Sequence, residues 1–158
     1  MSSGFRTYQI LEGLRIGAYP VDAEDVNTLS RLGIERVLNL VEDDEYAPGE
    51  RDAVQEALAA SGIEEWRLAL VDEDGLPYEL LEAAVLKVTR WLADGAQVYM
   101  HCRAGQHRSP ALAAGVLALR GRMGIDEALS HVNARKPTAD PLPQQREDLH
   151  RWWRTHSP

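Results

Sequence analysis

Strand-like and helix-like segments alternate along this chain, and this alternation limits the folds that are open to it. Three runs have the length and β-branched, apolar composition of strands: IERVLNLV at 34–41, IEEWRLALV at 63–71 and AQVYM at 96–100. A segment with helical features lies between each consecutive pair. Because parallel strands need long crossover connections, this order predicts an α/β fold with a central, mainly parallel sheet flanked by helices.

The predicted helices are marked by apolar spacing and by residues that start or stop a helix. Asp22 is a suitable N-cap and Gly33 a suitable stop for the first helix. Apolar residues recur with helical spacing from Leu81 to Leu92, which predicts an amphipathic helix after Pro77. The segment YQILEGLRIGAYP predicts a hairpin ahead of these elements. Further helices are expected at 51–60, 109–121, 125–135 and 143–154.

Length and composition predict one domain over residues 1–158. A chain of 158 residues with 44% hydrophobic and 27% charged residues is large enough to bury a core. One cysteine excludes an internal disulfide framework, and no Cys/His pairs have zinc-ligand spacing, so we expect neither metal nor cofactor. No signal peptide or membrane-spanning run is evident, which favours a cytoplasmic location. The net charge of −8 argues against nucleic acid or an anionic membrane as partner.

The single cysteine, Cys102, directly follows a predicted strand and precedes a helix that is apolar nearly all round. Its surroundings have the order H-C-x5-R-S, from His101 to Ser109. At this chain's own residue frequencies, His, Gly, Arg and Ser would fall at these places with a probability on the order of 10⁻⁵. This pattern therefore argues against reading Cys102 as a small buried hydrophobic residue, which is the common role of a lone cysteine.

A loop between a strand and a helix N-terminus points successive backbone N–H groups inward and can cradle a tetrahedral dianion. Gly105 lets the backbone curl, and Arg108 can hold two oxygens with parallel N–H donors. The same positive field favours a cysteine thiolate, so we expect Cys102 to be a nucleophile. The expected phosphate-binding residues are Arg103, Ala104, Gly105, Gln106, His107 and Arg108.

Cleavage of a phosphate ester by a thiolate also needs a proton donor for the leaving oxygen and a base for water. Asp72 and Asp74 are the candidates, because both follow the strand-like segment 63–71 and should lie at the same sheet edge as Cys102. Strand alternation favours Asp72, whereas Asp74 begins a D-G-x-P sequence. We expect Ser109 both to donate a hydrogen bond to the sulfur and to act as the helix N-cap.

With these residues, the chain resembles the dual-specificity subgroup of the protein tyrosine phosphatase superfamily, whose signature is H-C-x5-R-[ST]. The likeness extends over GLRIGAYP, LGIERVLNL and LPQQREDLHRW, and so over nearly the whole chain. The motifs at 71–77 and 98–109 are most similar to those of lipid-type phosphatidylglycerophosphate phosphatases. That resemblance implies that Asp72 is the general acid. The chain departs from phosphoinositide phosphatases in carrying Arg103, Gln106 and His107 where lysines often stand.

The resemblance implies a phosphate monoester hydrolase that works through a phosphocysteine intermediate. Two other functions remain open at this point: a phosphate-binding module without catalysis, and a sulfur transferase of the rhodanese type. The expected partner is a phosphorylated protein or a small or lipid phosphate. The predicted loop binds only the phosphate group of the substrate and so does not distinguish among these candidates. We expect the depth of the pocket to depend on other loops, such as 42–49.

Overall fold

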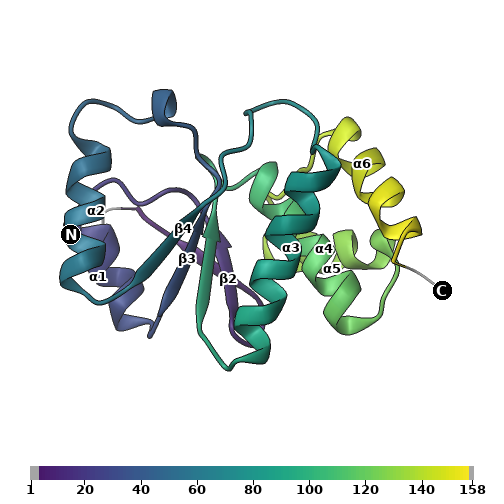
Figure 1. Ribbon diagram of the computed structural model, residues 1–158, viewed down its shortest axis with the longest axis horizontal. Coiled ribbons are helices and arrows are strands. Elements are labelled where there is room, and N and C mark those ends of the chain that lie inside the picture. The colour runs from purple at the N-terminus through teal and green to yellow at the C-terminus, as the bar shows by residue number, and fades with distance from the viewer. Residues whose placement is uncertain (1–3, 157–158) are drawn as a thin grey trace.

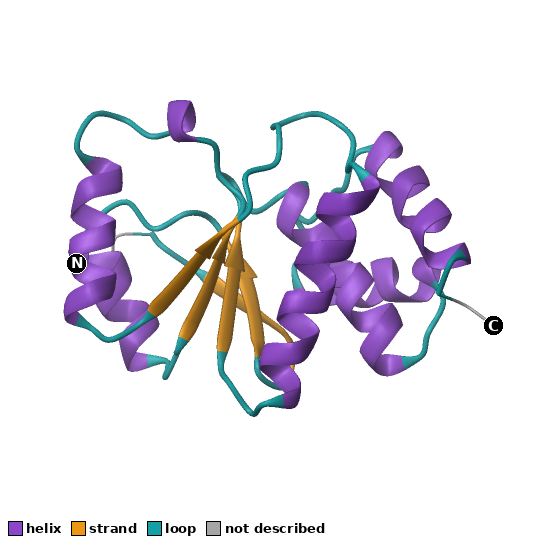
Figure 2. Cartoon of the chain, viewed as in Figure 1, coloured by secondary structure: helices purple, strands orange, loops and turns teal. Residues whose placement is uncertain are grey.

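The centre of the molecule is a five-stranded sheet in the order β1-β2-β5-β3-β4, seen in a computed structural model that describes residues 4–156 (Figure 1 and Figure 2). Only β1 and β2 are antiparallel, and the other neighbouring strands are parallel. The strands are β1 (Thr7–Leu11), β2 (Leu14–Gly17), β3 (Arg36–Asn39), β4 (Glu64–Arg67) and β5 (Val98–His101). The predicted α/β fold with a mainly parallel sheet is confirmed.

Helices cover both faces of the sheet. They are α1 (Ala23–Arg31), the short 3-10 helix η1 (Asp43–Glu45), α2 (Glu50–Ala60), α3 (Tyr78–Ala93), α4 (Arg108–Gly121), α5 (Ile125–Arg135) and α6 (Pro143–Arg154). Figure 1 shows α1 and α2 on one side of the sheet and α3 to α6 on the other. The core is correspondingly divided into a smaller cluster under α1 and α2 and a larger one under α3 and α4.

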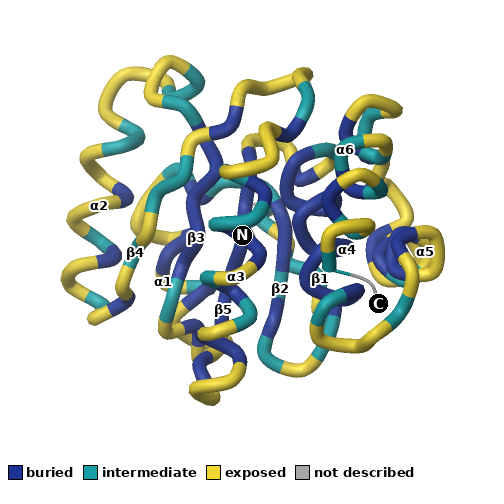
Figure 3. The backbone as a smooth tube through the Cα atoms, turned by 45° about the vertical axis from the view of Figure 1, so that its right-hand side comes forward, coloured by how far each residue is buried: buried dark blue, intermediate teal, exposed yellow. Residues whose placement is uncertain are grey.

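Helix α4 is the most deeply buried helix, as its apolar sequence predicts (Figure 3). Every residue from Arg108 to Ala118 is buried. The helix packs against α3, α5 and α6, and its N-terminus directly follows the loop after β5. The loop between β5 and α4, residues 102–107, is called the Cys102 loop below. Because β5 is the central strand, this loop lies in the middle of the sheet's carboxyl edge.

Two local predictions are wrong. The strand predicted at 63–71 ends at Arg67. Leu68 and Leu70 still donate backbone hydrogen bonds to the carbonyls of Asn39 and Leu40, but the chain no longer follows the regular strand pairing. Ser109 is not the N-cap of α4, because the helix already begins at Arg108 and the Ser109 hydroxyl faces the sulfur instead.

Candidate active site

The Cys102 loop curls tightly against the end of β2. Gly105 has a φ of +75°, in the left-handed region that favours glycine. A Cβ atom at this position would lie 2.7 Å from the carbonyl carbon of Gly17. The backbones of the two segments therefore approach each other more closely than any side chain at residue 105 would allow.

The sulfur of Cys102 lies at the bottom of this loop, and the residue is 1% exposed. The hydroxyl oxygen of Ser109 lies 3.4 Å from Sγ, and the backbone N–H of Ser109 donates to Sγ over 3.5 Å. Both groups can stabilise negative charge on the sulfur. The N-terminus of α4 adds its partial positive charge at the same place.

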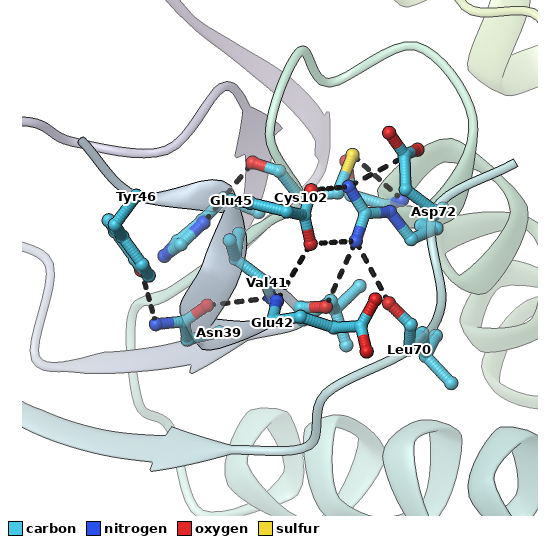
Figure 4. Close-up of polar contacts among 12 residues, drawn as sticks. Asn39, Val41, Glu42, Glu45, Tyr46, Leu70, Asp72 and Cys102 are labelled. Atoms are coloured by element: carbon cyan, nitrogen blue, oxygen red, sulfur yellow. Dashed lines mark hydrogen bonds and ion pairs between the residues drawn. The ribbon is translucent and has the colours of Figure 1, made fainter.

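Arg108 extends its guanidinium beneath the loop and is 1% exposed. Its two terminal nitrogens donate to both carboxylate oxygens of Glu45, over 2.9 and 2.7 Å. Nη1 also donates to the carbonyls of Leu40 and Leu70, over 3.3 and 2.9 Å (Figure 4). Burial alone would lower the pKa of Arg108, but the hydrogen bonds to Glu45 and the nearby negative charges raise it.

One donor of Arg108 remains free. Its Nε is buried and has no hydrogen-bond partner among residues 4–156. Nη2 lies 3.4 Å from a carboxylate oxygen of Asp72, a looser contact than the pair with Glu45. Nε and Nη2 can therefore bind two oxygens of an incoming phosphoryl group while Glu45 holds the other side of the guanidinium.

Glu45 is a site residue that the sequence analysis did not identify. It lies in η1, within the segment predicted only as a loop. The backbone N–H of Glu42 donates to the same carboxylate over 2.7 Å. Burial raises the pKa of Glu45, but the hydrogen bonds from Arg108 and Glu42 and the positive charge of Arg108 outweigh it and lower the pKa overall. The sequence signal that could have pointed to Glu45 is the acidic cluster that follows β3. This strand lies beside β5, which leads to Cys102.

The loop that carries Glu45 is anchored to the sheet by a second network. Asn39 donates to the Tyr46 hydroxyl over 2.8 Å (Figure 4). It also donates to the Glu65 carboxylate over 3.2 Å. Glu65 in turn forms a two-bond ion pair with Arg51 of α2. Residues from β3, β4 and α2 therefore hold η1 against the carboxyl edge of the sheet.

The two candidate aspartates occupy different surroundings. Asp72 lines a cavity of about 130 Å³ together with Cys102, Glu73 and residues of the loop. Asp74 is not among the residues that line this cavity, and its carboxylate accepts a hydrogen bond from the N–H of Gly75 over 2.8 Å. The geometry thus favours Asp72, although the argument from strand alternation fails because the strand ends at Arg67.

The predicted phosphate-binding residues lie in the loop after β5, except Arg108, which begins α4. Those that line the cavity with Cys102 are Arg103, Ala104, Gln106, His107 and Arg108, whereas Gly105 is buried against β2. The side chain of His107 is engaged at its Nδ1, which lies 2.7 Å from the Asp140 carbonyl oxygen. Since a carbonyl only accepts, Nδ1 carries the hydrogen.

His101 lies beneath the loop, inside the sheet, and is fully buried. Its Nδ1 donates to the Cys102 carbonyl over 3.3 Å, so this side chain orients the backbone at the start of the loop. Its Nε2 has no partner among the described residues. Burial lowers the pKa of His101 from 6.5 to about 4, so the ring is neutral at physiological pH.

The described residues offer neither a metal-binding cluster nor a membrane-spanning helix. Within residues 4–156, no group of three or more His, Cys, Asp or Glu side chains could hold a metal ion. In the same range, none of the helices combines the length and the apolar character needed to cross a bilayer.

Comparisons with known proteins agree with this geometry. The family model of the dual specificity phosphatase catalytic domain matches residues 16–155. No curated protein sequence matches the chain significantly. Among solved structures, a mutant form of Tk-PTP has a TM-score of 0.83 at 23% identity, and the match covers 95% of each chain.

Two further structures illustrate the range of similar proteins. PTPMT1 in complex with PI(5)P has a TM-score of 0.81 at 22% identity, covering 94% of this chain and 95% of that one. The human tyrosine phosphatase-like serine/threonine/tyrosine-interacting protein has a TM-score of 0.79 at 18% identity, covering 95% and 97%. At such identities the structures establish a shared fold. Because the family model spans nearly the whole sequence, the chain belongs to the dual specificity phosphatase catalytic domain family.

Proposed function

We propose that this protein hydrolyses phosphate monoesters through a phosphocysteine intermediate. The observation that carries the proposal is the convergence on one small cavity of a buried thiol, a guanidinium whose Nε has no partner among the described residues, and a carboxyl group, from Cys102, Arg108 and Asp72. Each of the three has a distinct role in the reaction.

In the first step, the thiolate of Cys102 attacks phosphorus and forms a P–S bond while the P–O bond to the leaving group breaks. Asp72 enters protonated and gives its proton to the departing oxygen. Arg108 and the backbone N–H groups of the loop stabilise the negative charge on the three equatorial oxygens. The products of this step are the free alcohol or phenol and a phosphorylated Cys102.

In the second step, the Asp72 carboxylate takes a proton from a water molecule whose oxygen attacks phosphorus. The P–S bond breaks, inorganic phosphate leaves and the Cys102 thiolate is restored. Ser109 assists by donating a hydrogen bond from its hydroxyl to the departing sulfur, 3.4 Å away. Asp72 ends the cycle protonated, as it began.

The substrate is a phosphorylated protein or a small or lipid phosphate. PTPMT1 was solved with the phospholipid PI(5)P, which supports including lipid phosphates among the candidates. A cysteine that works as a thiolate also suits a reducing compartment such as the cytoplasm.

A phosphate-binding module without catalysis is the second candidate. One similar structure is that of a tyrosine phosphatase-like protein described as serine/threonine/tyrosine-interacting. Here the intact Cys102, Arg108 and Asp72 favour turnover over binding alone. The family assignment likewise favours a phosphatase over a sulfur transferase.

The test is hydrolysis of p-nitrophenyl phosphate by the purified protein. We expect turnover that vanadate inhibits, that EDTA leaves unchanged and that Cys102→Ser abolishes. Phosphate bound by Cys102→Ser with an affinity similar to that of the wild type would confirm that the variant is folded. A wild-type protein that binds phosphate but releases no nitrophenol would instead identify a binding module, and activity retained in Cys102→Ser would refute the nucleophile.

A further inference from the structure

Two peptide groups of the Cys102 loop are held from outside by other parts of the chain. The N–H of Tyr19 donates to the carbonyl of Arg103 over 3.1 Å, and the N–H of Asp140 donates to the carbonyl of Gln106 over 2.7 Å. In a trans peptide the carbonyl and the following N–H point in opposite directions. Because the carbonyls of Arg103 and Gln106 are held outward, the N–H groups of Ala104 and His107 point the other way. They face the cavity, which Ala104 and His107 both line.

Asp140 contacts both the second of these peptide groups and the side chain that follows it. Asp140 donates its N–H to Gln106, and its own carbonyl accepts the Nδ1 hydrogen of His107 over 2.7 Å. The two hydrogen bonds join consecutive residues of the loop to a single residue of the segment between α5 and α6. We call this pair of bonds the His107–Asp140 latch.

The segment that carries Asp140 is itself firmly anchored. Asn133 of α5 donates to the carbonyl of Ala139 over 3.0 Å. Arg146 of α6 donates to the carbonyl of Pro141 over 2.9 Å and to the Asp140 carboxylate over 3.3 Å. Asp140 is thus a fixed point against which the Cys102 loop can be oriented.

We propose that His107 is a positioning residue: through the latch, its imidazole holds the Gln106–His107 peptide so that the His107 N–H points at the substrate phosphate. The proposal rests on the proposed function, and it adds a role that the order of residues in the loop does not reveal. From the sequence alone, His107 is predicted to bind phosphate. The latch assigns that contact to its backbone N–H, and it assigns to the side chain the task of holding that group in place.

The test compares three substitutions of His107. In Asn, the amide nitrogen is separated from Cα by the same number of bonds as Nδ1 of His, so His107→Asn can restore the bond to Asp140. In Gln the amide nitrogen lies one bond further out, and Ala has no donor. We expect the inhibition constant of vanadate to rise about 3- to 10-fold in His107→Ala and His107→Gln, the range of one lost hydrogen bond, and Asn to recover most of that loss.

A second measurement does not depend on activity. In ¹⁵N NMR spectra, neutral His107 should be the tautomer with hydrogen on Nδ1, and addition of tungstate should shift the backbone amide signal of His107. In His107→Ala, the Asp140 amide should exchange with solvent faster than in the wild type. Melting temperatures of all variants separate this local effect from a loss of folding.

The outcomes distinguish the latch from the proposed function. Equal vanadate inhibition of wild type and His107→Ala, a loss in Asn as large as that in Ala, or a hydrogen on Nε2 would overturn the latch while leaving the phosphatase assignment intact. A wild type without turnover would overturn the phosphatase assignment. The ring tautomer and the amide exchange would then still decide whether the latch exists.

Discussion

Asp72 and Asp74 are close neighbours in the sequence, but their carboxyl groups have different surroundings. Asp72 lines the cavity with Cys102 and lies 3.4 Å from Arg108. Asp74 shapes its own loop by accepting the N–H of Gly75, and its carbonyl accepts a hydrogen bond from Gln145. A proton donor must reach the leaving oxygen above phosphorus, and only a group on the cavity wall can do so.

We therefore predict that Asp72→Asn lowers kcat by roughly 10²- to 10⁴-fold on an alkyl phosphate, whose poor leaving group needs protonation. The loss should be far smaller on an activated aryl phosphate, whose leaving group departs with little help. The measurement is kcat for both substrates, together with the acidic limb of the pH profile. Asp74→Asn is the matched control and should keep most of the activity on both. The reverse pattern, with the leaving-group-dependent loss in Asp74→Asn, would move the acid role to Asp74.

At the scale of elements, the short helix η1 completes a site that is otherwise formed by the β5–α4 loop, the start of α4 and the segment after β4. Its Glu45 holds one side of the Arg108 guanidinium by two hydrogen bonds. The network of Asn39 and Glu65 then ties the segment that follows η1 to the sheet. The orientation of Arg108 therefore depends on the segments that follow β3 and β4, and not only on the start of α4 that contains it.

Glu45→Gln should weaken both the site and the fold. A neutral amide offers one acceptor oxygen where the carboxylate offers two, and leaves a buried guanidinium poorly paired. We expect a loss of about 1 to 3 kcal/mol in the free energy of unfolding, together with a rise in KM and a fall in kcat/KM for p-nitrophenyl phosphate.

The control for Glu45→Gln is Asp44→Asn in the same short helix, since Asp44 is exposed. It removes one negative charge nearby without touching Arg108, so it separates loss of charge from loss of the contact. Urea unfolding and steady-state kinetics of both variants are the measurements. Equal effects of the two substitutions would mean that general charge, and not the Glu45 contact, supports Arg108.

At the scale of the whole molecule, the sheet divides the core into two clusters and buries a neutral histidine between them. His101 belongs to β5, the central strand, and packs beside Tyr99 with ring centroids 5.7 Å apart. Charging this ring would place an ion in the interior. The stability of the fold is thus coupled to pH through a residue adjacent to the nucleophile.

The pKa of His101 is lowered from 6.5 to about 4, so between these values the unfolded chain binds a proton that the folded chain does not. The contribution of His101 to stability is therefore complete above pH 6.5 and is lost as the pH falls toward 4. A shift of this size is worth about 3 kcal/mol. Glu45 and Glu65, whose pKa values are lowered, add a further loss below pH 4.5.

Denaturant unfolding at a series of pH values, together with an NMR titration of the His101 ring, tests this coupling. His101→Asn should be less stable at neutral pH but should show a flatter dependence between pH 6.5 and 4. A His101 ring that titrates near 6.5, or a wild-type stability that stays constant over this interval, would contradict the prediction.

Local sequence information determined the elements and the chemistry of one loop. The spacing of apolar residues along α3 and the uniform apolar character of α4 are fixed by the chain itself, because a helix repeats every 3.6 residues whatever it packs against. The sequence from His101 to Ser109 likewise predicts an anion-binding loop, because the strand, the loop and the helix that form it are consecutive in the chain. The parallel sheet followed from the same alternation.

Contacts between distant segments were decided only by the tertiary structure. Glu45 meets Arg108 across 63 positions of sequence, and His107 meets Asp140 across 33. No periodicity records such pairs, because they arise when β3, β5 and the segment between α5 and α6 converge at one edge of the sheet. The same holds for Asp72: the strand before it ends early because the chain must leave the ladder to reach the cavity. When the partner of a side chain lies in a distant segment, the tertiary packing determines the contact, and the local sequence pattern does not.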